Sequence, residues 1–132
     1  MSLITERYLL QIEETLALLQ KRQPCSVIFA EFPPSHGTVV SMFDRTSYTI
    51  YFNMDLVENI SEEELIGLLI HEGRHAYQWF QVTNPDSRLE KQEVIAKWQS
   101  EFDNYAQPKS NGFEREYVEQ ELEIDAVAFT KI

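Results

Sequence analysis

The sequence predicts an α+β fold: a small antiparallel sheet of about three strands packed on a bundle of about four helices. Three observations predict it. Apolar residues recur at helical spacing in several long segments, three short β-rich runs lie together in the first half, and hydrophobic residues make up 43% of the chain. A chain of 132 residues with this composition fits one domain, residues 1–132, that buries its own core.

The first segment, residues 3–22, is predicted to be an amphipathic helix. Its apolar stripe consists of Leu9, Ile12, Leu16 and Leu19. Three β-rich runs follow, at residues 26–32, 38–43 and 47–53. The turn Asp44-Arg45-Thr46 between the last two predicts a hairpin. Since the last run leads almost directly into the next helix, we expect it either to line a cleft and pair an extended peptide or to be an ordinary half-buried strand.

The stretch from Ser61 to Phe80 predicts a buried central helix. Ser61 and Glu64 are spaced as a capping box, and the acidic first turn suits the positive end of the helix dipole. Apolar residues then cover most sides of the helix. Gly73 inside it costs about 1 kcal/mol relative to alanine, which would be tolerated if another backbone must approach closely there.

This helix contains the motif His71-Glu72-x-x-His75. Residues four apart project from one helical face, so the two imidazoles can bind a single Zn²⁺. Glu72 lies between them and can hold a water molecule at the open position of the metal. The alternative is a pair of core or surface histidines beside a solvated glutamate.

Two further helices are expected. The first, residues 86–105, follows Asn84-Pro85, and its buried stripe would consist of Ile95, Trp98, Phe102 and Tyr105. The second begins at Asn111-Gly112-Phe113-Glu114, which resembles a capping box, and runs to the end of the chain.

A catalytic zinc site needs three protein ligands and an open position. Gln81 stands where a third histidine of an extended motif would be, so a carboxylate of the last helix is expected to be the third ligand. Its polar face would hold Glu116, Glu119 and Glu123, next to Thr130. Glu121 and Asp125 fall on the largely apolar face, where a carboxylate is costly unless it is paired or bound to metal. We therefore expect Glu121 to be the third ligand and Asp125 to fix the tautomer of a ligand histidine. The main alternative ligand is Glu123, and ordinary surface acids are the other interpretation.

Composition limits the partners. A formal net charge of −11 argues against a nucleic acid or an anionic membrane surface, since both would be repelled. Cys25 is the single cysteine, so neither a disulfide framework nor a cysteine-based zinc cluster is expected. The charges in the first residues fit no signal peptide and no apolar run has the length of a membrane span, so the cytoplasm is the expected location.

The motif His71-Glu72-x-x-His75, followed by a helix with Glu121-x-x-x-Asp125, resembles the gluzincin metallopeptidases. Within them, residues 48–132 look most like the minimal single-domain members, including the ImmA/IrrE-like group associated with phage and mobile elements. The run Ala126-Val127-Ala128-Phe129 is similar to the small-residue pattern after the acids of that family. The resemblance implies a zincin-like fold with a metal helix and a glutamate helix, a Zn²⁺ cofactor, and a protein or peptide substrate such as a regulator.

The expected activity is that of a zinc-dependent endopeptidase. Glu72 would act as general base and then as general acid at a zinc ion bound by His71, His75 and Glu121. Tyr117, one turn before Glu121, could stabilise the oxyanion, and Tyr77 or Tyr105 could equally do so. The alternative is a non-catalytic, zinc-stabilised acidic interaction module, for example an inhibitor of a DNA-binding protein.

Overall fold

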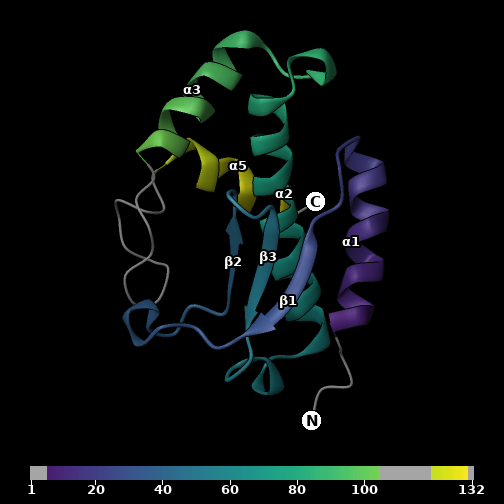
Figure 1. Ribbon diagram of the computed structural model, residues 1–132, viewed down its shortest axis with the longest axis vertical. Helices are drawn as coiled ribbons and strands as arrows, with labels where there is room; N and C mark the ends of the chain where they lie inside the picture. Colours follow the sequence, from purple (N-terminus) through teal and green to yellow (C-terminus); the bar gives the residue numbers. More distant parts are fainter. Residues whose placement is uncertain (1–5, 105–119, 131–132) are drawn as a thin grey trace.

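The computed structural model describes residues 6–104 and 120–130. Within these residues the structure has one three-stranded sheet and four α-helices (Figure 1), which confirms the predicted α+β class. The helices are α1 (Glu6–Gln20), α2 (Glu62–Thr83), α3 (Gln92–Asp103) and α5 (Glu121–Thr130), and the strands are β1 (Ser26–Ala30), β2 (Ser41–Asp44) and β3 (Thr49–Asn53).

The sheet is mixed, which corrects the expectation of an antiparallel one. The predicted hairpin is confirmed, since β2 and β3 pair antiparallel with Ser41 opposite Phe52. β1 pairs parallel to β3, with Ser26 opposite Thr49. The first two strands run in opposite directions but are not neighbours, because the third strand inserts between them (Figure 1). β3 is therefore the central strand, with both of its edges paired.

Two hydrophobic clusters meet on α2. Ile50 and Phe52 of β3 are fully buried in the first cluster, which joins the sheet to α1 and to the N-terminal half of α2. The second cluster joins the C-terminal half of α2 to α3 and α5. Its buried members are Tyr77, Val82, Ile95, Trp98, Phe102 and Leu122. Because α2 is packed on several sides, it is a rigid support for side chains that project from it.

The start of α2 follows its sequence signal. The hydroxyl of Ser61 accepts a hydrogen bond from the backbone N–H of Glu64 at 3.1 Å, which confirms this half of the predicted capping box. The helix then runs for 22 residues behind the sheet (Figure 1). No helix in the described part of the chain is both long and apolar enough to cross a membrane.

The helix predicted at residues 86–105 is shorter. Residues Pro85–Ser87 form a separate 3-10 turn, and α3 begins only at Gln92. The intervening loop is held by Gln81, whose Oε1 accepts hydrogen bonds from the N–H groups of Leu89 (2.7 Å) and Glu90 (3.2 Å). The predicted stripe is confirmed where it is described: Ile95, Trp98 and Phe102 are buried, while Tyr105 lies outside the described residues.

The buried face of α1 differs from the predicted stripe. Leu19 is 74% exposed, whereas Glu13 is fully buried. Glu13 turns inward because Arg22 neutralises it: Nη1 lies 2.6 Å from Oε2 and Nη2 lies 2.8 Å from Oε1, with both side chains fully buried. Oε2 also accepts a hydrogen bond from the N–H of Cys25 at 2.7 Å. The pair satisfies both charges inside the protein, which a lone buried charge could not do.

This ion pair explains Gly73. A Cβ atom at position 73 would lie 2.9 Å from Nη2 of Arg22 and 3.5 Å from Oε1 of Glu13. The close approach is thus made by a buried side chain, not by the backbone expected from the sequence. Gly67, two turns earlier on α2, has no atom of another element within 4 Å of the equivalent position.

The two glycines should respond oppositely to alanine. Gly67→Ala is expected to stabilise the metal-free protein by up to about 1 kcal/mol through helix propensity. Gly73→Ala gains the same propensity but must displace the buried guanidinium, and disturbing a buried ion pair costs about 3 kcal/mol or more, so a net loss of about 2 kcal/mol is expected. Urea unfolding of both variants in the presence of EDTA measures the difference. Equal free energies of unfolding would show that Arg22 moves aside freely.

Candidate metal centre

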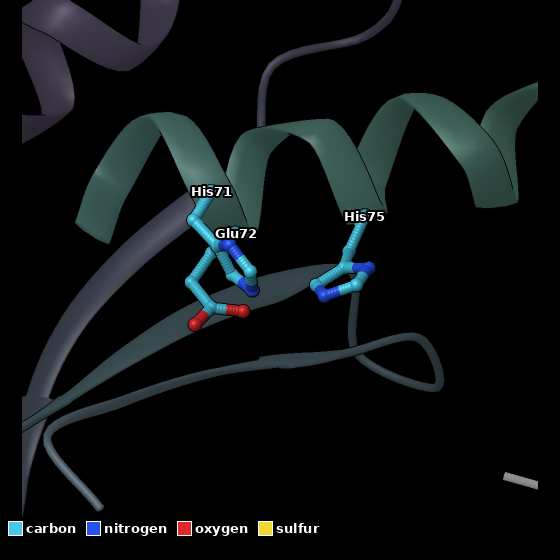
Figure 2. A group of neighbouring side chains, drawn as sticks. All are labelled: His71, Glu72 and His75. Atoms are coloured by element: carbon cyan, nitrogen blue, oxygen red, sulfur yellow. The ribbon is translucent and has the colours of Figure 1, made fainter. Parts of the chain in front are cut away.

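His71 and His75 project from the same side of α2 (Figure 2), as the four-residue spacing predicts. Their ring centroids lie 4.9 Å apart with an interplanar angle of 86°. His75 is buried, and 17% of the His71 side chain is exposed. Ligand atoms of His71, Glu72 and His75 lie within 4.8 Å of one another. The motif therefore gathers three potential donors at one place on the helix.

The acid that reaches both imidazoles is Glu123, on α5. Its Oε1 lies 3.1 Å from Nε2 of His71, and its Oε2 lies 2.9 Å from Nε2 of His75. The residue is only 2% exposed. A buried carboxylate that faces two ring nitrogens in this way has the arrangement of a shared ligand set.

Glu121, the expected third ligand, is not brought to the histidines. It is exposed, and its backbone N–H, at the start of α5, donates to Glu101 of α3. The predicted assignment of faces was wrong. α5 begins at Glu121 and directs Leu122, Glu123 and Ala126 toward the interior.

Asp125 affects the site through Gln78, a residue that was not predicted from the sequence. The amide nitrogen of Gln78 donates to the carbonyl oxygen of Leu122 at 3.0 Å and to Oδ2 of Asp125 at 2.7 Å. The amide oxygen then lies 2.9 Å from Nδ1 of His75. Since this oxygen can only accept, Nδ1 of His75 carries the proton and Nε2 is the ring nitrogen available to a metal. Asp125 therefore orients Gln78, and Gln78 in turn fixes the tautomer.

Arg74 also binds the carboxylate of Asp125. Its Nε lies 2.7 Å from Oδ2 and its Nη2 lies 3.2 Å from Oδ1. The guanidinium also stacks on the rings of Tyr77 (4.4 Å) and Phe129 (4.7 Å). This contact joins α5 to α2 at the residue that precedes His75.

The electrostatics of the site favour a bound cation. Burial alone would lower the pKa of His75, but the charge of Glu123, with smaller contributions from Glu72 and Gln78, raises it to about 9. Burial alone would raise the pKa of Glu123, yet the two imidazoles hold that pKa far below its ordinary range. Glu123 thus remains a carboxylate at neutral pH, in a position where a positive charge is stabilised.

Glu72, the expected general base, is 5% exposed and is held by the sheet. Its Oε2 accepts a hydrogen bond from the hydroxyl of Ser41 on β2 at 2.8 Å, and Ser41 is itself buried. Tyr117 and Tyr105, which were considered as oxyanion donors, lie outside the described residues.

The donor set fits zinc. Zinc is bound at about 2.0–2.1 Å by nitrogen and about 2.0–2.2 Å by carboxylate oxygen, so two ligand atoms of a tetrahedral ion lie roughly 3.3 Å apart. The separations between Glu123 and the two Nε2 atoms, 3.1 Å and 2.9 Å, are slightly shorter. Two neutral imidazoles and one carboxylate are also a ligand combination used by catalytic zinc sites.

A substitution of Gln78 tests whether the contact with His75 supports metal binding. Gln78→Leu removes the partner of the His75 Nδ1–H group and a donor to Asp125, so zinc affinity is expected to fall about 10- to 100-fold, the usual cost of losing such a partner. Competition with a chromophoric chelator measures the affinity. Gln11→Leu, at an exposed position of α1, is the matched control and should bind zinc like the unmodified protein. Unchanged affinity in Gln78→Leu would contradict the role given to Gln78.

Comparisons of the chain with models of known protein families, with curated proteins and with solved structures gave no match.

Proposed function

We propose that the protein is a zinc-dependent endopeptidase of the cytoplasm that hydrolyses a peptide bond in a protein substrate. The observation that supports it best is the presence of two buried acids with different contacts at the histidine pair. Glu123 faces both Nε2 atoms, whereas Glu72, from the same helix as the histidines, lies within 4.8 Å of them and accepts a hydrogen bond from Ser41. A purely structural zinc site would need the first acid but not the second.

Zinc, when bound, would polarise the scissile carbonyl and lower the pKa of a water molecule to about 7. The residues of the chain supply the rest. Glu72 would act as the general base toward the attacking water and then as the general acid toward the leaving amine. The hydrogen bond from Ser41 restricts the carboxylate of Glu72 to one orientation, so it is preorganised for both transfers.

Tyr77 is a poor choice as oxyanion donor. Its hydroxyl donates to Glu90 at 2.5 Å, and its ring packs against Trp98 of α3. Burial and this hydrogen bond raise the pKa of the phenol well above its ordinary value. Tyr117, which lies outside the described residues, remains the proposed donor.

The substrate is proposed to bind along β2 and not along β3, the strand first considered for this role, because β3 is paired on both edges. The carbonyl of Val40 accepts from the N–H of Asn53 at 2.7 Å, so Val40 turns its backbone groups toward β3. By the alternation of an antiparallel ladder, Ser41 and Phe43 turn theirs away from it. No strand pairs with this outer edge within residues 6–104 and 120–130. An extended peptide added here would pass beside Glu72, the partner of Ser41.

The test combines metal content with cleavage. The purified protein is expected to bind one zinc ion per chain and to generate new N-termini in a mixture of denatured cytoplasmic proteins, detected by terminal labelling and mass spectrometry. A chelator such as 1,10-phenanthroline should abolish the cleavage, and added zinc should restore it. A protein that binds zinc stoichiometrically but cleaves nothing in this mixture would favour the acidic interaction module, for which the net charge of −11 is the supporting observation.

A further inference from the structure

The proposed ligand Glu123 lies on a short helix whose first two backbone N–H groups are bound by another helix. α5 has ten residues, fewer than an isolated helix needs to be stable in water. Its apolar residues do not form one buried stripe, since Ile124 is 50% exposed and Val127 is 43% exposed. The residue before the helix is Gln120, which is not one of the short polar residues that cap a helix from within the chain.

The cap of α5 comes from another helix. The carboxylate of Glu101, near the end of α3, accepts two backbone hydrogen bonds: Oε2 from the N–H of Glu121 at 2.9 Å and Oε1 from the N–H of Leu122 at 2.8 Å. These are the first two residues of α5, whose N–H groups have no partner inside the helix. A negative charge at this end also opposes the positive pole of the helix dipole.

Glu101 is itself held rigidly. The neighbouring Trp98 and Phe102 are buried against α2, where the ring of Phe102 lies 5.0 Å from that of Trp79. The Glu101 side chain is only 13% exposed, and Lys97, one turn earlier, lies 3.7 Å from Oε2. Since α3 packs on α2, Glu101 fixes the first residue of α5 relative to α2. That residue, Glu121, stands two residues before Glu123.

We propose that Glu101 is a positioning residue for the metal centre. Because Glu101 caps α5 from outside the helix, it fixes the rotation of α5 about its axis and the position of α5 along that axis. Both determine where the carboxylate of Glu123 lies relative to His71 and His75. Gln78 and Arg74 also bind α5, at the carbonyl oxygen of Leu122 and at the side chain of Asp125, whereas Glu101 binds the backbone N–H groups of the first two residues. This inference rests on the proposed zinc site for its functional meaning, but its structural part can be tested without metal.

The test uses the full-length protein with Glu101→Ala and Glu101→Gln. Zinc affinity, measured by chelator competition, is expected to fall about 10- to 100-fold in Glu101→Ala, in the range for residues that orient a ligand. Glu101→Gln should lie between Glu101→Ala and the unmodified protein, because its carbonyl oxygen can still accept one of the two bonds. The absorption spectrum of the Co²⁺-substituted protein should change in both variants, which a loss of stability alone would not cause.

The control is Glu93→Gln, which removes the same charge from an exposed position of α3 and should leave zinc affinity unchanged. Hydrogen exchange of the metal-free proteins gives the independent readout: amides of α5 should exchange faster in Glu101→Gln, while those of β3 should not change. Unchanged exchange in α5, or equal loss of zinc affinity in Glu93→Gln, would overturn the inference. Absence of zinc binding in the unmodified protein would instead refute the proposed function, and the exchange data would still decide the role of Glu101.

Discussion

Glu123→Ala is expected to abolish stoichiometric zinc binding, while Glu121→Ala leaves it intact. Glu123 lies within 3.1 Å of both Nε2 atoms and is buried, so its loss removes a carboxylate that faces both rings directly. Glu121 is exposed, and its backbone N–H donates a hydrogen bond to Glu101. The reduction for Glu123→Ala should exceed the roughly 100-fold upper range of changes outside the ligand set.

The two positions form a matched pair, since each substitution removes one glutamate from the first turn of α5. Metal content after dialysis, with circular dichroism to check folding, gives the comparison. Glu123→Gln serves as a second variant if the alanine protein is unstable, because it keeps the shape of the side chain. Loss of zinc in Glu121→Ala with retention in Glu123→Ala would reverse the assignment.

Glu72→Gln is expected to retain zinc and to lose hydrolysis. The glutamine keeps the shape of the side chain and can still accept a hydrogen bond from Ser41, but it cannot accept a proton from water. Loss of a general base typically lowers a rate about 10²- to 10⁴-fold. The rate is to be measured on a cleavage site identified with the unmodified protein, at saturating zinc.

Glu63→Gln provides the control for charge, because Glu63 is an exposed residue in the first turn of the same helix. Its rate should equal that of the unmodified protein. Hydrolysis at the normal rate by Glu72→Gln would eliminate the general-base mechanism. If the interaction module is the correct function, Glu72→Gln should instead leave partner binding intact, and added salt should weaken that binding.

The parts of the site that the sequence predicted are those set by local geometry. A spacing of four residues directs two side chains to one helical face whatever surrounds them, so His71 and His75 were found without tertiary information. Gln78 could have been found in the same way, because it stands three residues after His75 on the neighbouring part of that face. Ser41 carried no such signal: it is one serine in a β-rich run, and only the packing of β2 against α2 gives it a role.

The error over which acid of α5 faces the histidines has a different cause. Hydrophobic periodicity locates the buried face of a helix only where apolar residues are segregated, and in α5 they are not. Leu122 and Ala126 are buried with Glu123, whereas Ile124 and Val127 are exposed. The prediction for α1 was wrong for a related reason. Hydrophobic periodicity expects apolar residues at interior positions, but a charged residue such as Glu13 can be buried there when it is paired, here with Arg22. The parallel pairing of β1 likewise depends on contacts between distant segments.

The buried Glu13–Arg22 pair also constrains how this chain can diverge. Losing either member alone leaves an isolated charge in the interior, at a cost of about 3–5 kcal/mol, a large part of the stability of a small domain. Glycine at position 73 is needed only while a guanidinium lies against it. Positions 13, 22 and 73 should therefore vary together among descendants of this sequence, and a lineage that replaced the pair with apolar side chains would be free to acquire alanine between the two halves of its metal-binding motif.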